Sequence, residues 1–404
     1  MVRHKEAGDM AESLSVLMVV HNPTQRGGAY FRARGLAKPL VRRGHDVTVL
    51  AIHPTNRLRM VESEIEGFKV VESPDLLPGI GRSGWDPWDT LRRTLWLRKQ
   101  RFDIIHTVDT RPAVCLPALL ARRSAGAKWV ADWTDWWGRG GATTERKNRL
   151  VNAVMGPIEQ LFEEKPRPYA DGTVVISKAL GERAVGLGIP ASTQLYLPPG
   201  ADPHDIRHTT IAEARASLGL APSVPLLGYL GNIYPNDADL LFETLRRLRH
   251  EVRLVMVGDP GVEAPDDLAS RVDVLGRVPF GTMLDHLSAC DTLVLPMTDS
   301  TANRGRWPSK INEYVAVGRP TVACAVGDVA SLISDHDIGL LCAPEADEFA
   351  AQIDALLDDP ARASVMGENA RNLALNEYSQ DAVAERLERY YLDVLQRAGR
   401  KPRN

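Results

Sequence analysis

The chain has 404 residues, of which 44% are hydrophobic and 25% are charged, and its formal net charge at pH 7 is −3. This composition is typical of a soluble globular protein of about two domains, and the charge excludes a general attraction to nucleic acid or to membranes. The four cysteines lie far apart in apolar runs, which excludes metal-ligand spacing and indicates buried thiols in a reducing compartment, expected to be the cytoplasm. No apolar run approaches the roughly 20 residues of a membrane span. Residues 1–13 lack the apolar core of a secretory signal and are expected to form a disordered extension.

The N-terminal half begins with the pattern of a strand, a glycine loop, a helix and a second strand. The apolar run 15–21 predicts a strand buried on both faces, followed by a helix over about 29–43 and a strand over 46–51. In the loop, Gly27 and Gly28 allow the backbone to approach a ligand phosphate. Ordinary turns also need glycine, and the spacing is not that of dinucleotide-binding enzymes, so no NAD site is predicted.

A basic amphipathic helix is predicted within residues 85–102. Trp88, Leu91 and Leu95 recur there at helical spacing, and arginines and lysines accompany them. Such a helix can lie on an anionic membrane surface, which would make the protein peripheral at the inner face of the membrane. The alternative is a domain helix whose apolar stripe faces the core and whose basic face is solvated.

Polar residues follow the next two predicted strands. The strand within 102–109 ends at Asp109, and the strand that begins at residue 128 leads into Asp132, Asp135 and Trp136. Open α/β sheets bind ligands at the carboxyl ends of their strands. Carboxylates accept hydrogen bonds from sugar hydroxyls and tryptophan faces can stack on sugars, although the tryptophans here would equally suit a wall between domains. Two residues separate Asp132 from Asp135, so their spacing is not that of a metal-binding DxD motif.

A linker and a second α/β unit follow. Ser177 ends a further strand and is expected to face the cleft by the same rule. The Pro/Gly-rich stretch 197–203 predicts the linker between domains. A strand then ends in a turn at Gly231 and Asn232, which repeats the N-terminal design.

The most informative stretch begins at Pro308. Ser309 is a suitable N-cap for a short helix that should end at Gly318 in a left-handed conformation. The first turn offers unpaired N–H groups, a positive dipole end and the ammonium of Lys310, which together suit a phosphate. Glu313 lies one turn further on the same face, where its carboxylate can accept bonds from two ribose hydroxyls. The alternative is a surface helix in which Lys310 and Glu313 merely pair.

These residues resemble the donor-binding segment of family-4 retaining glycosyltransferases of the GT-B fold. The similarity is closest to the branch with the motif PSK-x-x-E-Y-x-A-x-G-x-P. Asp135–Trp136 matches the Asp of an Arg-Asp-x-Trp-like sequence of the same branch, with Thr134 in place of the Arg. Three features depart from the wider family. The first Glu of its Glu-x7-Glu motif is Gly305 here, its active-site His is Val108, and the basic pair that clamps the diphosphate after Asn232 is missing.

The resemblance implies two doubly wound Rossmann-like domains that face a cleft, over residues 14–200 and 201–379, with a C-terminal helix at 380–397 that crosses back. The acceptor side is expected on the first domain and the donor side on the second. The expected donor-binding residues are Gly27, Gly28, Gly231, Asn232, Gly258, Asp259, Arg277, Val278, Pro308, Ser309, Lys310 and Glu313. The expected catalytic residues are Lys310, Asp109 and Asp135, and the expected acceptor-side residues are Asp132, Trp136 and Ser177.

The implied reaction moves a sugar from a nucleotide diphosphate sugar to an acceptor hydroxyl with retention, in bacterial glycan, glycolipid or glycoconjugate synthesis. No metal or other cofactor and no nucleic acid partner is expected, and the acceptor would be a sugar, a lipid-linked or a small molecule. Lys310 and the helix end would neutralise the leaving diphosphate, helped by Arg304 or Arg306. Two alternatives remain open, a nucleotide-sugar 2-epimerase of the same fold and a non-catalytic member that binds a nucleotide or a partner.

Overall fold

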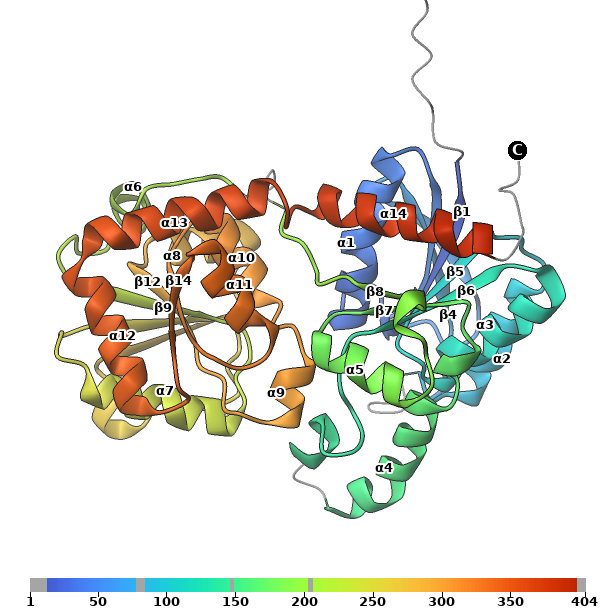
Figure 1. The fold of residues 1–404 in the computed structure, drawn as a ribbon, viewed down its shortest axis with the longest axis horizontal. Coiled ribbons are helices and arrows are strands. Elements are labelled where there is room, and N and C mark those ends of the chain that lie inside the picture. Colours follow the sequence, from blue (N-terminus) through green and yellow to red (C-terminus); the bar gives the residue numbers. More distant parts are fainter. Residues whose placement is uncertain (1–12, 78–83, 146–148, 203–205, 398–404) are drawn as a thin grey trace, which may run out of the picture.

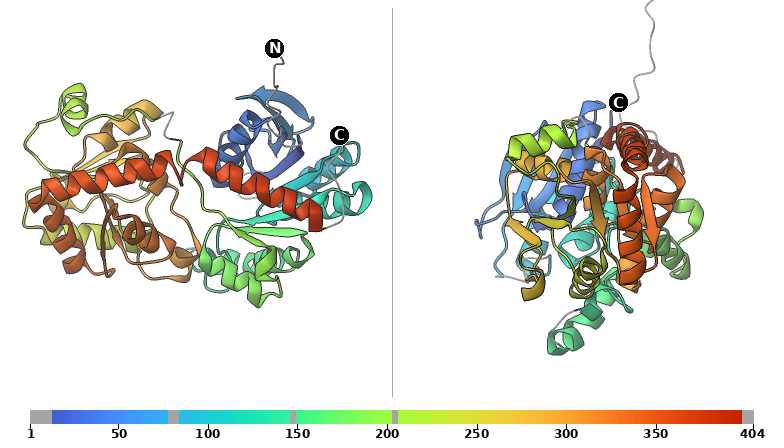
Figure 2. Two further views of the ribbon diagram at one scale, coloured as in Figure 1. Left: turned by 45° about the horizontal axis from the view of Figure 1, so that its top comes forward. Right: turned by 90° about the vertical axis from the view of Figure 1, so that its left-hand side faces the viewer.

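A computed structural model of the chain describes residues 13–77, 84–145, 149–202 and 206–397. Figure 1 shows two α/β units side by side, with the C-terminal helices running across both, and Figure 2 shows the same crossing from two further directions. The expected disordered extension at 1–13 lies, apart from Ser13, outside the described residues. Within the described residues, no helix has both the length and the apolar character needed to cross a membrane.

The first sheet has the strand order β3-β4-β2-β1-β5-β6-β7-β8. Its strands pair in parallel except for the antiparallel pair of β3 and β4 at one edge, and β1 lies in the middle, with Leu17 opposite both Thr48 and Ile105. The strands are β1 (Ser15–Pro23), β2 (Asp46–Ile52), β3 (Val61–Ile65), β4 (Phe68–Ser73), β5 (Ile104–Val108), β6 (Lys128–Trp133), β7 (Gly172–Val175) and β8 (Gln194–Tyr196).

The second sheet is parallel throughout its described pairs and has the order β11-β10-β9-β12-β13-β14. Its strands β9, β12 and β13 are short apolar runs without exposed residues, as strands covered on both faces require. The strands are β9 (Leu226–Leu230), β10 (Arg253–Val257), β11 (Val272–Gly276), β12 (Thr292–Leu295), β13 (Thr321–Cys324) and β14 (Gly339–Cys342).

Helices connect the strands in both units. Those of the first are α1 (Gly28–Arg42), α2 (Pro87–Leu97), α3 (Pro112–Ala125), α4 (Arg149–Glu164) and α5 (Lys178–Gly186). Those of the second are α6 (Ile211–Leu218), α7 (Pro235–Arg247), α8 (Phe280–Ser288), α9 (Thr301–Gly305), α10 (Lys310–Val317), α11 (Asp328–His336), α12 (Ala346–Asp358) and α13 (Pro360–Leu375). The last helix, α14 (Gln380–Arg397), returns to the first unit.

The core of the first unit has two sides. Successive residues of β1 alternate between them, with Val16 and Met18 in a cluster that includes α1 and α14, and Leu17 and Val19 in a cluster that includes α3. This alternation follows from the two-residue period of a strand covered on both faces. Tyr391 of α14 is fully buried in the first cluster, so the return helix is part of the N-terminal core. The predicted doubly wound sheets and the helix that crosses back are therefore confirmed.

The two connections between the units are tied to each other. Ala201 in the linker donates its N–H to the carbonyl of Tyr378 at 2.7 Å and accepts from the N–H of Gln380 at 2.8 Å. Gly200 lies so close that an added Cβ would be 2.8 Å from the carbonyl oxygen of Ser379. The linker and the approach to α14 thus form one paired crossing, and glycine is needed there because of its close backbone contact.

The predicted basic helix is α2, but its buried face is not the one expected. Leu91 and Leu95 are 48% and 47% exposed, whereas Asp89 and Arg93 are fully buried as an ion pair at 2.6 Å. Asp89 also accepts a hydrogen bond from the Ser73 hydroxyl at 2.5 Å. The alternative in which the stripe of Leu91 and Leu95 faces the core is therefore wrong, because the buried ion pair occupies the inner face.

Candidate functional site

A cavity of about 470 Å³ lies between the two units. Gly28 and Phe31 of α1 line one wall, and Ser309 and Glu313 at the start of α10 line the opposite wall together with Phe280. The glycine loop after β1 and the start of α10, predicted from separate parts of the sequence, therefore share one crevice. Gly27 holds a left-handed backbone (φ 78°) beside the Asn22 side chain, and it precedes the helix that carries this wall.

A second cavity, of about 380 Å³, adjoins the first because Ser309 and Glu313 line both. It brings Lys310 and Arg306 together with Asp135 of the opposite unit. Its remaining lining includes Tyr229, Gly231, Asn232, Tyr234 and Pro308. The two cavities form one crevice, with Glu313 where they meet and Lys310 in the second cavity.

The local structure at the start of α10 is mostly as predicted. Gly318 ends the helix in the left-handed region at φ 70°, and Pro320 precedes β13. Ser309 differs, since its backbone is helical and its hydroxyl makes no capping bond, so the predicted N-cap role is wrong. Ser309 is instead exposed at the cavity edge, where a ligand oxygen can reach its hydroxyl. The N–H groups of Ile311 and Asn312 donate to the carbonyls of Pro308 and Ser309.

Lys310 is held by the turn after β9. Its ammonium donates a hydrogen bond to the carbonyl of Asn232 at 3.0 Å and another to the Tyr229 hydroxyl, and it lies 3.7 Å from the centre of the Tyr229 ring. Burial, together with the charge of Arg306, lowers the pKa of Lys310 well below its usual value. Among the described side chains, no ion pair joins Lys310 and Glu313, so the simple pairing considered above is not formed.

Glu313 is enclosed between the two cavities. Burial raises the pKa of its carboxyl to about 7, and Lys310 counteracts this rise only in part. Hydrogen bonds donated by the hydroxyl groups of a ligand would stabilise the ionised form of this carboxyl.

Arg304 and Arg306 differ in position, although they are two residues apart. Arg304 is exposed and pairs with Asp299 at 2.5 Å, whereas Arg306 lines the second cavity. Arg306 binds Asp237 at 3.2 Å and lies 4.4 Å from the centre of the Tyr234 ring. Its buried Nε has no hydrogen-bond partner among the residues that the structure describes. Of the two arginines, Arg306 is the one placed to assist Lys310.

The remaining donor-side candidates lie directly after β10 and β11. Gly258 holds φ 103° against the turn, where an added Cβ would be 3.1 Å from the Cα of Gly231. The Asp259 carboxylate accepts from the N–H of Gly261 and so closes the next turn. Gly258, Asp259, Arg277 and Val278 are not among the residues that line either cavity. Gly258 therefore supports the turn rather than touching the crevice.

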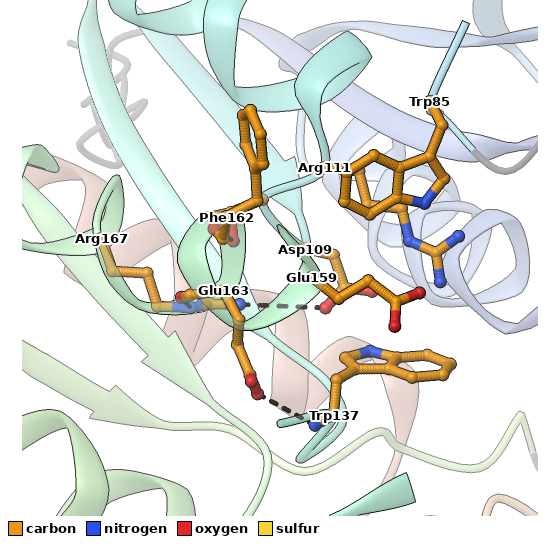
Figure 3. Close-up of a pocket in the computed structure, with 9 residues that line it drawn as sticks. Trp85, Asp109, Arg111, Trp137, Glu159, Phe162, Glu163 and Arg167 are labelled. Carbon is orange, nitrogen blue, oxygen red and sulfur yellow. Dashed lines mark hydrogen bonds and ion pairs between the residues drawn. The ribbon is translucent and has the colours of Figure 1, made fainter. Parts of the chain in front are cut away.

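Asp135 and Asp109 lie at the ends of neighbouring strands but in different surroundings. Asp135 lines the second cavity, and burial, with the nearby charge of Asp109, raises its pKa to about 7. Asp109 is 3% exposed with φ 66°, and its carboxylate accepts a hydrogen bond from Thr134 at 3.2 Å. Figure 3 shows Asp109 in a separate small pocket with Trp85, Arg111, Trp137, Glu159 and Arg167.

Two acceptor-side candidates are fully buried. Asp132 accepts a hydrogen bond from Arg32 at 2.9 Å and lies 3.2 Å from His106, with no exposed surface. Ser177 caps α5 through the N–H of Leu180 and donates to the carbonyl of Gly305 at 2.9 Å. Neither side chain can contact an acceptor in this structure, so both predictions are corrected to structural roles.

Two matches to protein families cover most of the chain. The glycosyl transferase 4-like domain matches residues 27–200, and the glycosyl transferases group 1 family matches residues 224–359. The chain therefore has the two domains of a GT-B glycosyltransferase. Among the described residues of these glycosyltransferase domains, no three His, Cys, Asp or Glu side chains are grouped to hold a metal ion.

Similar proteins and structures agree with this assignment. The D-inositol 3-phosphate glycosyltransferase of Stackebrandtia nassauensis is 29% identical over 227 residues, which is 51% of this chain and 50% of that protein. The enzyme of the same name from Nocardia farcinica is 32% identical over 190 residues, 42% and 41% of the two chains. The chain thus spans about half the length of the curated relatives it matches.

Solved structures match over nearly the whole chain. Sucrose-phosphate synthase from Thermosynechococcus elongatus superposes with a TM-score of 0.75 at 18% identity, over 95% of this chain and 99% of that one. Anabaena Alr3699/HepE in complex with UDP and glucose superposes with a TM-score of 0.69 at 17% identity, over 93% and 98%. These similarities confirm the predicted GT-B fold.

In these glycosyltransferase domains, Trp136 explains the glycine at position 305. A Cβ added to Gly305 would lie 2.6 Å from the Cβ of Trp136, so the indole occupies the space of any side chain there. Trp136 thus forms the wall between domains that the sequence allowed as an alternative. The cavity residue Tyr229 and the buried Glu163, described below, were missed from the sequence, because neither has a local pattern that distinguishes it from an ordinary strand or helix residue.

Proposed function

We propose that the protein transfers a sugar from a nucleotide diphosphate sugar to an acceptor hydroxyl, with retention of configuration. The observation that carries this proposal is the shared crevice in which Gly28 faces Ser309 and Glu313, continuous with the cavity of Lys310 and Asp135. A donor fits this order of groups. The nucleoside would occupy the first cavity with its ribose on Glu313, the diphosphate would cross the start of α10, and the sugar would enter the second cavity.

The chemistry that follows is stabilisation of the leaving group. As the glycosidic C–O bond stretches, negative charge grows on the diphosphate, and Lys310, Arg306 and the positive dipole end of α10 would neutralise it. The low pKa of Lys310 supports this role, because a diphosphate would restore the charged form in a site that otherwise disfavours it. The leaving phosphate oxygen would take the acceptor proton, so the proposed reaction uses no protein nucleophile and no metal.

The acceptor would approach from the N-terminal domain, and we propose a sugar, a lipid-linked or a small-molecule acceptor in bacterial glycan, glycolipid or glycoconjugate synthesis. The exposed face of α2 supports membrane contact by this domain. Leu91 and Leu95 are about half exposed, Arg92 lies 5.3 Å from the centre of the Trp88 ring, and Arg98 at the end of the helix is exposed. An apolar stripe flanked by arginines can insert at an anionic lipid surface.

Vesicle sedimentation tests the membrane contact. The protein should sediment with phosphatidylglycerol-containing vesicles and remain free with phosphatidylcholine vesicles. Leu91→Asp with Leu95→Asp should abolish sedimentation, and Leu375→Asp, an exposed leucine of the other domain, serves as the control. Equal sedimentation of the double variant and the wild type would refute contact through α2.

A nucleotide panel tests the main proposal. Because a ligand that binds the folded state raises the melting temperature, one of UDP, GDP, ADP and TDP should stabilise the protein. The matching nucleotide sugars should then release nucleotide when an acceptor is supplied. Release of UDP from UDP-GlcNAc alone, with formation of free 2-epimerised sugar, would favour the epimerase instead. Absence of stabilisation by all four nucleotides would overturn the proposal.

A further inference from the structure

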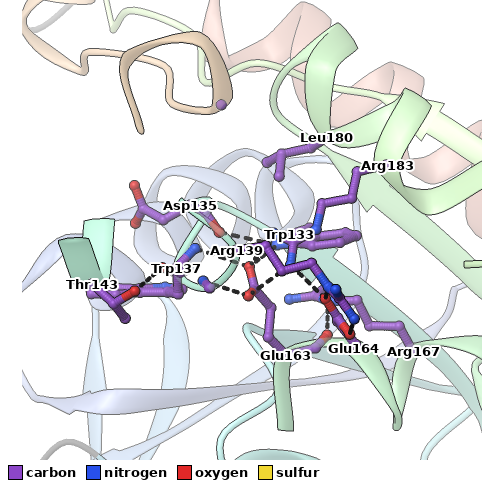
Figure 4. Close-up of polar contacts among 12 residues, drawn as sticks. Trp133, Asp135, Trp137, Arg139, Thr143, Glu163, Glu164, Arg167, Leu180 and Arg183 are labelled. Carbon is purple, nitrogen blue, oxygen red and sulfur yellow. Dashed lines mark hydrogen bonds and ion pairs between the residues drawn. The ribbon is translucent and has the colours of Figure 1, made fainter. Parts of the chain in front are cut away.

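The loop that follows β6 reaches from the N-terminal domain into the cleft. Its residues 134–138 carry Asp135 and Trp136, and Figure 4 shows the Asp135 carboxylate pointing away from the polar cluster behind the loop. Among the described residues that line the cavity of Lys310, Asp135 alone comes from the N-terminal domain. A sugar attached to a diphosphate at the start of α10 would therefore meet this one side chain of the opposite wall.

Glu163 of α4 holds the loop from behind. One of its carboxylate oxygens accepts from the N–H of Trp137 at 2.9 Å and from the indole of Trp133 at 3.2 Å, and the other accepts from the N–H of Gly138 at 2.7 Å. Arg183 donates to both oxygens, at 3.0 and 3.2 Å. Glu163 is 4% exposed, so these bonds are shielded from water and a poor partner in their place would be costly.

The neighbouring Glu164 has a different set of partners. It binds Arg139 at 2.5 Å and Arg183 at 2.9 Å, and among the described residues it accepts no hydrogen bond from a backbone N–H of the loop. The two adjacent glutamates are similarly buried and share Arg183, but Glu163 alone grips the loop backbone. Glu164 is therefore a matched control for Glu163.

Trp136 fixes the front of the loop. Its indole packs on Gly305 of the C-terminal domain, and the Arg183 guanidinium lies 4.5 Å from the centre of its ring. Ser177 bonds the carbonyl of the same glycine at 2.9 Å. Glu163 therefore holds the backbone that follows Asp135, and the contact of Trp136 with Gly305 holds the neighbouring side chain.

We propose that this loop selects the donor sugar, with Asp135 accepting hydrogen bonds from sugar hydroxyls and Glu163 acting as the positioning residue. This inference rests on the proposed function. Glu313 lines both cavities and is assigned to the ribose, which leaves Asp135 as the carboxylate on the sugar side. A buried group built to accept from a hydroxyl rejects an analogue that lacks it, because the acceptor is then left without a partner.

Donor analogues test the inference directly. The probes are the nucleoside diphosphate of the panel above that raises the melting temperature, its most rapidly used hexose conjugate, and the monodeoxy analogues of that hexose. In the wild type, removal of one particular hydroxyl should lower kcat/KM by about tenfold or more. Asp135→Asn should lower kcat/KM for the intact donor and remove the penalty for that one deoxy position. Affinity for the nucleoside diphosphate, measured by calorimetry, should stay within about twofold.

The positioning role is tested by Glu163→Gln against Glu164→Gln. In Glu163→Gln the side-chain amide would turn N–H groups toward the N–H donors of the loop, so the loop would no longer be held. The variant should therefore have a lower kcat and a weaker preference for the same hydroxyl, with the nucleotide affinity retained. Glu164→Gln should retain that preference. An unchanged preference in Asp135→Asn, or equal effects of the two glutamine variants, would overturn the inference while nucleotide binding still supports the proposed function. A wild type that binds no nucleotide would instead refute both.

Discussion

The ammonium of Lys310 and the ring of Tyr229 form a close cation–π contact of 3.7 Å, 81 residues apart in the chain. The same ammonium donates to the carbonyl of Asn232, so the turn after β9 fixes the position of the cation in the cavity. Burial depresses the pKa of Lys310 in this position. The site therefore holds a cation that gains from an incoming anion, which is the physical basis of the proposed diphosphate binding.

Replacing Lys310 with alanine should lower turnover by about 10²-fold or more, because the charge that stabilises the leaving diphosphate is lost. Steady-state kinetics measures the effect, and circular dichroism should show an unchanged fold. Arg304→Ala is the control, since Arg304 is exposed and paired with Asp299 outside the cavity. Turnover equal to that of the wild type in Lys310→Ala would reject the phosphate role.

Glu313→Gln should weaken nucleotide binding, because a neutral amide accepts poorly from two ribose hydroxyls. The pKa of Glu313 is raised to about 7 by burial, so its ionised form becomes populated as the pH rises through neutrality. Wild-type affinity should therefore increase with pH across this range, and the affinity of the variant should be lower and flatter. Calorimetry with UDP and GDP about one pH unit below and above neutrality measures both. Identical pH profiles would contradict the assignment.

Asp135→Asn should change the pH dependence of stability. Burial and Asp109 raise the pKa of Asp135 from 3.8 to about 7 in the folded protein. Between these values the folded state binds more protons than the unfolded state, so the free energy of unfolding falls as the pH rises. The asparagine variant lacks this fall. Its free energy of unfolding relative to that of the wild type should therefore rise from pH 3.8 to about 7 and then level off. Urea unfolding at a series of pH values measures the difference.

Gly305→Ala should destabilise the protein by about 1–3 kcal/mol, because a methyl group there overlaps Trp136 and forces a shift between the domains. Turnover should fall with it, since the displaced loop carries Asp135. Gly281→Ala in α8 is the matched control, because an added Cβ there meets no atom within 4 Å. If both alanine variants unfold at the same urea concentration as the wild type, the contact between Trp136 and Gly305 carries no strain.

Several features could be predicted because they depend on neighbours in the sequence. The end of α10 at Gly318 and the start of β13 after Pro320 follow from backbone conformations that only a few residues prefer. The apolar runs of the parallel strands and the glycine loop before α1 are local signals of the same kind. The PSK motif and the second glutamate, Glu313, then indicated the donor side of the GT-B fold.

Other features depend on which surfaces meet after the chain has folded. Asp132 and Asp135 are three residues apart, yet one lies within β6 against Arg32 and the other lies beyond the strand in the cleft. The polar inner face of α2 likewise depends on its contact with Ser73 at the end of β4. Periodicity reports that a helix has two faces, but the partners available on each face decide which one is buried.

The amino-acid sequence alone determined the element order, the two α/β domains and the cationic helix start, because these arise from local conformational preference and apolar period. The tertiary structure decided that Gly28 and Ser309 share a crevice, that Trp136 fills the space beside Gly305, and that Glu163 clamps the loop of Asp135. These features bring together residues between 25 and 281 positions apart. Their formation depends on how the domains pack, which no local pattern encodes.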